Sequence, residues 1–343
     1  MQWFTKDDGR RLPVEDRYLL PILSPTAPGT NYWEPPPAGK ISERQQGRIL
    51  LQIHQVVDLL TSFGVDLGGR RLCDIGTGNG MVPRLLLEFS DIAEAIGADP
   101  FLDGEHKTSW QPHDHDETLQ DLKKFFAARM GGRFDVAVYD EFIGHENFSM
   151  RPAPVAATPQ PGKRYRFAQI GAHDLHTLGE TFDLFYCKAI EHIPDWPGVF
   201  ASMTRAAKPG AVVYFKHRPF FSYLGPHRYA STMIPWGHVL LTDAEFRRYA
   251  KTHHAERADT MIEFFFEGLA YPRYSVSDML RIACDHGWAS VGLVVEPPRY
   301  LAKVQKFIGD VEGFWDMQRG NYPNVGSEEL FSGMYHVVLR LEE

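Results

Sequence analysis

Apolar residues first recur in a regular pattern after a start that is rich in proline and glycine. Residues 1–42 predict an irregular N-terminal arm, because prolines and glycines interrupt any periodic run. Between the candidate N-cap Ser42 and Gly64, apolar residues recur at helical spacing, which predicts a helix packed on a core. The residues with this spacing are Ile49, Ile53, Val56, Val57 and Leu60.

Short apolar runs then alternate with helical patterns. The run 71–75 leads into a glycine turn at 76–80, a helical pattern follows, and a second run ends at Asp99. Strand, helix and strand within about thirty residues form a right-handed βαβ unit, which begins a parallel sheet. Further along the chain, we predict strands 166–170, 182–187, 211–216, 290–295 and 335–341, and helices 196–207 and 275–286.

Two long segments interrupt this alternation. Residues 101–165 contain a polar patch, a predicted helix near 117–130 and a proline-rich stretch, and residues 217–274 are rich in aromatic side chains. Both follow strand ends, and long connections within a domain are often functional. We therefore predict one domain over 43–343, in which the two insertions form a cap over the ligand-binding edge.

Charge and cysteine content narrow the function classes. The net charge of −8 and the absence of a basic run disfavour nucleic acid as a partner. No run of residues is long and apolar enough for a membrane span, and the N-terminus lacks the pattern of a secretory signal. The three cysteines lie far apart, which fits a reducing cytoplasm. The aromatic run at 261–266 would suit either the core or a homodimer interface.

The glycine turn carries the first chemical signal. A glycine turn between a strand and a helix lets a ligand approach the backbone, and the helix start presents free N–H groups. Asp74 lies two residues before the first glycine, where it would repel a pyrophosphate and suit a ligand with a cationic end. Asp99 closes the next strand, where a carboxylate can accept hydrogen bonds from both hydroxyls of a ribose.

With three later segments, these two motifs resemble the ordered signature of class I S-adenosylmethionine-dependent methyltransferases. The five segments are Cys73 to Gly80, Gly97 to Pro100, Phe182 to Phe185, Ala189 to Asp195 and Lys208 to Val212. The resemblance implies a doubly wound α/β fold with a mostly parallel sheet of seven strands, the last of them antiparallel. It also implies S-adenosylmethionine as the cofactor, with cofactor and acceptor at the carboxyl ends of the strands.

The resemblance also assigns the cofactor site. Asp74, Gly76 and Gly78 would cradle the methionine part, and Asp99 would hold the ribose. The usual acidic residue at the third strand end is replaced by glycine, so we expect Ala172 or His173 to meet the adenine through the backbone. The full predicted set is Asp74, Gly76, Thr77, Gly78, Gly80, Asp99, Pro100, Ala172, His173 and Lys188.

Metal binding is not expected. Some relatives hold a metal with a Glu-x-x-Glu-His pattern, and the pair Glu191-His192 matches its second half. Lys188 stands where the first glutamate would be, so a divalent ion would lose a ligand and meet a like charge. The polar patch His113 to Asp116 is more typical of a solvated cap.

The arm after the fifth strand is the candidate acceptor site. Its predicted substrate-binding residues are Arg218, Tyr223, His227, Arg228 and Trp236. If the acceptor is a hydroxyl, a histidine is the natural base near neutral pH, and the candidates are His192, His217 and His238. We expect O-methylation of a small polar metabolite such as a sugar or secondary metabolite. The alternatives are N- or S-methylation, a protein or RNA acceptor, and a non-methylating binding module.

Overall fold

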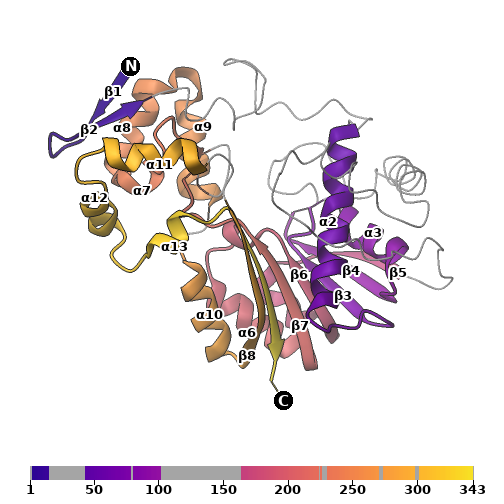
Figure 1. Ribbon diagram of the computed structural model, residues 1–343. Coiled ribbons are helices and arrows are strands. Elements are labelled where there is room, and N and C mark those ends of the chain that lie inside the picture. Colours follow the sequence, from indigo (N-terminus) through magenta and orange to yellow (C-terminus); the bar gives the residue numbers. More distant parts are fainter. Residues whose placement is uncertain are drawn as a thin grey trace.

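The computed structural model describes most of the chain outside the first long insertion. The described residues are 2–14, 43–78, 80–101, 164–223, 225, 230–269, 273–297 and 301–342. The polar patch and the helix predicted near 117–130 therefore lie outside them, as do His227 and Arg228. The described residues form two lobes, which we call the sheet lobe and the helical lobe (Figure 1).

The sheet lobe is built on a seven-stranded sheet with the order β5-β4-β3-β6-β7-β9-β8. Strands β3 to β7 pair in parallel, whereas β9 is antiparallel to both of its neighbours, β7 and β8. The predicted fold with an antiparallel last strand is thus confirmed. The strands are β3 (Arg71–Ile75), β4 (Glu94–Asp99), β5 (Arg164–Gln169), β6 (Phe182–Cys187), β7 (Ala207–His217), β8 (Trp288–Glu296) and β9 (Met334–Leu341).

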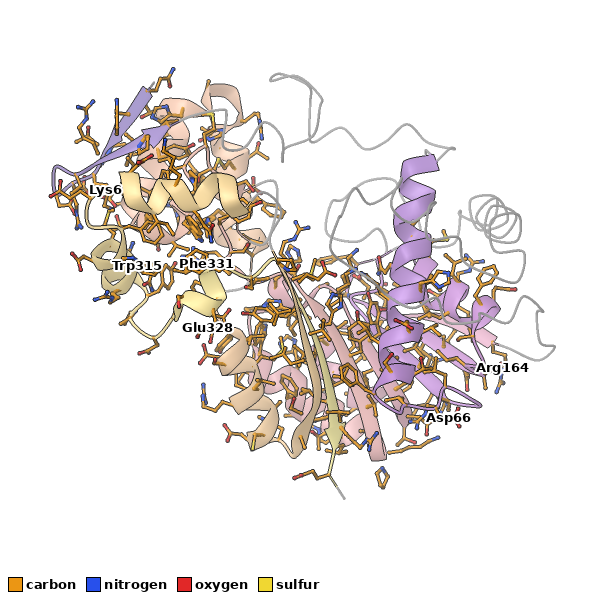
Figure 2. All side chains as sticks on the ribbon, in the orientation of Figure 1. Lys6, Asp66, Arg164, Trp315, Glu328 and Phe331 are labelled. Atoms are coloured by element: carbon orange, nitrogen blue, oxygen red, sulfur yellow. The ribbon has the colours of Figure 1, made fainter. Side chains whose placement is uncertain are left out.

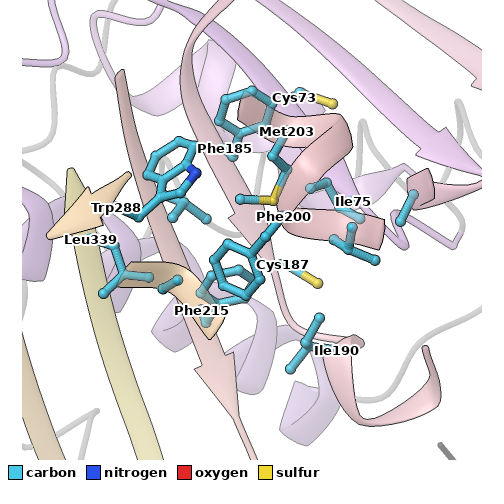
Figure 3. Close-up of a cluster of buried hydrophobic side chains, with 14 of the residues drawn as sticks. Cys73, Ile75, Phe185, Cys187, Ile190, Phe200, Met203, Phe215, Trp288 and Leu339 are labelled. Carbon is cyan, nitrogen blue, oxygen red and sulfur yellow. The ribbon is translucent and has the colours of Figure 1, made fainter. Parts of the chain in front are cut away.

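Helices cover both faces of this sheet, because alternate apolar residues of each central strand point to opposite faces. On one face, Phe185 and Phe215 pack with Phe200 and Trp288 (Figure 3). On the other face, Leu184 and neighbouring apolar residues pack under α2, the helix predicted between Ser42 and Gly64. The helical segments of this lobe are α2 (Glu43–Ser62), α3 (Met81–Phe89), η1 (Ala172–Leu178), η2 (Ile190–His192), α6 (Trp196–Ala206) and α10 (Val276–Asp285).

The helical lobe has an apolar core of its own and lies beyond the carboxyl end of β7 (Figures 1 and 2). Three separate stretches build it: the start of the chain, the second insertion, and residues 301–330. Its helices are α7 (Gly237–Leu240), α8 (Asp243–His253), η4 (Ala255–Arg257), α9 (Ala258–Glu263), the π-helix η5 (Phe264–Gly268), α11 (Leu301–Asp310), α12 (Phe314–Asn321) and α13 (Ser327–Leu330).

A hairpin at the N-terminus differs from the irregular arm expected there. Strands β1 (Gln2–Thr5) and β2 (Arg11–Val14) pair antiparallel, and Phe4 and Leu12 join the core of the helical lobe. The buried Lys6 anchors the hairpin, because its ammonium donates to the carboxylate of Glu245 and to the carbonyl of Leu240 at 2.7 Å. Apolar side chains on one side of the hairpin thus hold it to this core, and the rest of the predicted arm, 15–42, lies outside the described residues.

None of the helices among the described residues combines the length and the apolar character that crossing a membrane would require.

Candidate active site

The glycine turn after β3 has the open backbone that the sequence predicted. The N–H groups of Gly76 and Thr77 both donate to the carbonyl of Ala98, at 2.8 and 3.2 Å, which ties the turn to the end of β4. Gly76 and Gly78 have φ values of +71° and +56°, a region that favours glycine. A Cβ on Gly76 would lie 2.7 Å from the Cβ of Ala189, whereas a Cβ on Gly78 would point into open space.

Two buried carboxylates flank this turn. The hydroxyl of Thr77 donates to Asp74 Oδ2 at 2.7 Å, and the N–H of Gly78 donates to Asp99 Oδ2 at 2.9 Å. Burial raises the pKa of Asp74 to about 7, and the charge of Asp99 adds to this, whereas the Thr77 hydroxyl and the Lys188 ammonium act to lower it. A cationic group placed beside Asp74 would therefore gain from meeting a carboxylate that has little else to neutralise it.

Tyr165 is part of the site, although no sequence motif indicated it. Its hydroxyl, on β5, lies against Gly80 and Gly97, where any Cβ would clash with it. The side chain of Thr77 contacts the same glycine of β4. Burial raises the pKa of the Tyr165 phenol, so this group stays neutral. Tyr165 thus supports the turn from β5. Its position depends on the register in which β5 pairs with β4.

The predicted adenine contacts lie at the start of η1, beyond the end of β5. Ala172 is buried, and His173 is partly exposed, with Nε2 3.9 Å from a carboxylate oxygen of Asp195. Asp195 caps α6 by accepting from the N–H of Gly198 at 3.0 Å. Pro100 is exposed just past β4, and its carbonyl accepts from a side chain of β5. These residues lie at the same carboxyl edge as the glycine turn.

These features fit the methionine and ribose parts of S-adenosylmethionine. A buried carboxylate is available for a cationic end, a second carboxylate lies where a ribose diol would, and the glycine backbone leaves space between them. Lys188 follows β6 and donates to the side chain of Gln52 at 3.0 Å.

His217 ends β7 in an unusual environment. Its side chain is only 2% exposed, and neither ring nitrogen has a hydrogen-bond partner among the described residues. Its Nδ1 lies 3.8 Å from Oε2 of Glu191, which is also buried without a hydrogen bond among those residues. Glu329 of α13 is a second buried carboxyl near this ring, and one of its oxygens accepts from the N–H of Val276 at 2.8 Å.

The other two candidate bases lie in different environments. His192 lies in η2, and its Nδ1 donates to the carbonyl of Gly268 at 2.6 Å, which joins the two lobes. His238 lies in the helical lobe, where burial lowers its pKa to about 3 and its ring packs against Phe220. The structure therefore brings His192 and His217 to the strand ends and separates His238 from them.

Two of the predicted acceptor residues lie in the core of the helical lobe. Tyr223 and Trp236 are 2% and 0% exposed, and the indole N–H of Trp236 donates to the carbonyl of Leu330 at 3.1 Å. These contacts give both side chains a packing role. Arg218 is exposed just beyond β7. Across the described ranges, no group of three or more His, Cys, Asp or Glu side chains is placed to hold a metal ion.

Comparison with known proteins identifies the family. Residues 46–265, more than half of the chain, match the family described as "Methyltransferase domain". The chain belongs to this family. Together with the ordered motifs and the observed sheet, this match makes the protein a class I S-adenosylmethionine-dependent methyltransferase. No curated protein matches this chain in sequence.

Solved structures of similar fold include three that are 14% to 16% identical in sequence to this chain. Magnesium protoporphyrin IX methyltransferase from Synechocystis, with bound SAH, is 14% identical, covers 89% of each chain and has a TM-score of 0.42. An S-adenosylmethionine-dependent methyltransferase from Mesorhizobium loti is 16% identical, with 82% and 95% coverage and a TM-score of 0.39. A cyclopropane synthase from Mycobacterium tuberculosis is 14% identical, with 83% and 84% coverage and a TM-score of 0.40. Likeness at this level says nothing about the acceptor.

Proposed function

We propose that the protein transfers the methyl group of S-adenosylmethionine to a hydroxyl of a small polar metabolite. The observation that carries the choice of a hydroxyl is the pair His217 and Glu191 at the strand ends. Buried polar atoms normally have hydrogen-bond partners, and an acceptor hydroxyl would supply one for the imidazole. The net charge of −8 supports a small acceptor over a nucleic acid.

In this proposal, the glycine turn and its carboxylates hold the cofactor. Asp74 neutralises a cationic end, Asp99 accepts hydrogen bonds from the ribose hydroxyls, and Gly76 and Gly78 keep the backbone clear. Bound S-adenosylmethionine supplies an electrophilic methyl group on a sulfonium. The chain's main task is then to align the acceptor, and alignment contributes on the order of 7–11 kcal/mol to lowering a barrier of this kind.

His217 has the role of general base. Its ring takes the proton that the acceptor hydroxyl loses as the new bond to carbon forms. The carboxylate of Glu191 stabilises the resulting imidazolium, because opposite charges attract strongly where water is excluded. Since only 2% of the His217 side chain is exposed, the acceptor must displace some of the side chains that cover the ring to reach it.

The test compares single-turnover rates of His217→Ala, His192→Ala and His238→Ala, with an alcohol acceptor found by screening hydroxylated metabolites with radiolabelled cofactor. We expect His217→Ala to be about 100-fold slower or more, the range for loss of a general base. Calorimetry with S-adenosylhomocysteine should show unchanged cofactor affinity in all three variants. A near-normal rate in His217→Ala would contradict the assignment of the base, and methylation of amines or thiols alone would contradict the choice of a hydroxyl.

A further inference from the structure

A second buried carboxyl lies near His217 and has no part in the proposed proton transfer. Glu329 is 1% exposed and belongs to α13, which lies between the helical lobe and α10 (Figure 1). Its Oε1 accepts from the N–H of Val276, at the start of α10, at 2.8 Å. Its Oε2 is buried and has no hydrogen-bond partner among the described residues. Buried polar atoms normally have partners, so a bound donor would satisfy this oxygen.

Strand pairing places Glu329 close to the end of β7. His217, the last residue of β7, pairs with Tyr335 at the start of β9. Ser332 Oγ donates to the carbonyl of Glu329 at 2.8 Å, which ties the end of α13 to the turn before β9. The ring of Trp196 packs edge-on against the ring of His217, with centroids 5.5 Å apart, and belongs to the same apolar cluster as the first residue of α10. Glu329 thus lies between the strand end that carries His217 and the start of α10.

Buried polar atoms without hydrogen-bond partners gather around this imidazole, as far as the described residues show. They are Oε2 of Glu191, both ring nitrogens of His217 and Oε2 of Glu329. His217 Nδ1 lies 3.8 Å from Glu191 Oε2, and the imidazole also acts electrostatically on Glu329. The ring is therefore flanked by two carboxyls, and the buried ring itself has unused hydrogen-bonding capacity. These features are typical of a ligand site rather than of a solvated acidic patch.

The proposed proton transfer accounts for only one of these two carboxylates. When His217 takes the proton, a single imidazolium forms, and Glu191 offsets its charge. Burial raises the pKa of Glu329, and the charge of Glu328 adds to this, whereas the N–H of Val276 and the imidazole of His217 act to lower it. A buried carboxylate is costly unless an opposite charge pairs with it. A cation carried by the acceptor would give each carboxylate one opposite charge.

We propose that Glu329 binds a cationic amino group of the acceptor, next to the hydroxyl that His217 deprotonates. This inference rests on the proposed function and narrows its substrate class to amino alcohols. The ammonium group donates a hydrogen bond to Oε2 of Glu329 and keeps its protons throughout, because the proton that moves is that of the hydroxyl. After transfer, the imidazolium and the ammonium face two carboxylates. The bound ammonium also escapes methylation, because a protonated amine has no lone pair with which to attack the methyl group.

The first test measures binding by NMR titration, with saturating S-adenosylhomocysteine, of amines and of uncharged alcohols of similar shape. The pairs are ethanolamine with ethylene glycol, serinol with glycerol, and glucosamine with glucose. We expect the amine of at least one pair to bind about tenfold more tightly or better. Glu329→Gln should bind both members of that pair equally, and its amide oxygen can still accept from the N–H of Val276. Equal affinities within every pair, or no binding of any amine, would overturn the subsite.

Glu328→Gln is the matched control, because it removes the same charge from the same helix at an exposed position. This variant should keep the preference for the amine. If Glu329→Gln folds poorly, the comparison within each pair still tests the subsite in the unaltered protein. A preference that disappears in Glu191→Gln and persists in Glu329→Gln would assign the ammonium to the other carboxylate and overturn the subsite.

The second test follows methyl transfer to the same pairs and separates the subsite from the proposed function. The unaltered enzyme should methylate the hydroxyl of the amine with a kcat/KM about tenfold higher than that of its uncharged counterpart, through a lower KM. Equal transfer to both hydroxyls would overturn the subsite while supporting the proposed function. Amine binding that depends on Glu329, with no transfer to any hydroxyl, would contradict the proposed function while supporting the subsite. Transfer to nitrogen would contradict both.

Discussion

Asp74 is a carboxyl group placed where ionisation is expensive. It is buried at the end of β3, and burial, aided by the charge of Asp99, raises its pKa to about 7. The folded chain thus binds a proton at Asp74 more tightly than the unfolded chain does. The contribution of this group to stability is present at low pH and is lost as the pH rises through about 7. A cationic ligand stabilises the ionised carboxylate of Asp74, so its binding displaces this proton.

Cofactor affinity should consequently depend on pH below neutrality. Between about pH 5.5 and about pH 7, the ionised fraction of Asp74 rises, and the affinity for S-adenosylmethionine should rise by about tenfold with it. Calorimetry across this range should also show that the protein releases a proton on binding. Asp74→Asn should bind more weakly and lose the pH dependence. An equally steep dependence in Asp74→Asn would assign the titration to another group.

Motif spacing predicted some of the site's residues and could not predict others. The structure brings Asp74, Gly78 and Asp99 together, because a turn between consecutive strands is local in sequence; their contact with the cofactor stays a prediction. Tyr165 and Glu329 had no such signal. Their positions depend on which strands pair and in which register, and a single strand's sequence does not state this.

At the scale of the element, the glycine turn depends on two different properties. Gly76 needs both a positive φ and a missing Cβ, because Ala189 lies against it. Gly78 needs only the positive φ, because no atom of the described residues lies within 4 Å of a Cβ built there. That space is where the proposed cofactor approaches the backbone. The two positions therefore separate the stability of the turn from its binding.

Replacing each glycine by alanine should reveal this difference. Each variant should lose about 1–2 kcal/mol of unfolding free energy from the left-handed backbone. Gly76→Ala should lose more, because its Cβ also meets Ala189. Gly78→Ala should keep more stability but bind S-adenosylhomocysteine more weakly than its stability loss explains. Denaturant unfolding and calorimetry measure the two effects. Equal losses of stability in the two variants would contradict the packing argument.

The elements that the sequence analysis missed are short or depend on distant partners. The hairpin 2–14 has strands of four residues and a proline in β2, so its periodic signal is weak. Helices α11, α12 and α13 were not predicted, and each contributes buried apolar side chains to the core of the helical lobe. By contrast, α8 begins with a capping box between Thr242 and Glu245, which is a local signal for a helix start.

At the scale of the whole molecule, three distant stretches of chain build the helical lobe. The second insertion supplies Trp236, but the fully buried ring packs against Phe314 of α12 and Phe331, which come much later in the chain. The sequence showed an aromatic segment after a strand end, where ligands often bind, and could not show that a second core would bury it. Arg218 remains at the edge between strand and lobe, where the proposed acceptor binds.

The central claim is that the turn after β3 and the carboxylate of Asp99 bind S-adenosylmethionine. Calorimetric titration of the cofactor into the unaltered protein, Asp99→Ala and the control Asp285→Ala tests it most directly; Asp285 is exposed at the end of α10. We expect the unaltered protein and Asp285→Ala to bind the cofactor with equal affinity. Asp99→Ala should bind about 1.5–3 kcal/mol more weakly, the range for a hydrogen bond to a charged group. Equal affinity in Asp99→Ala would contradict the account.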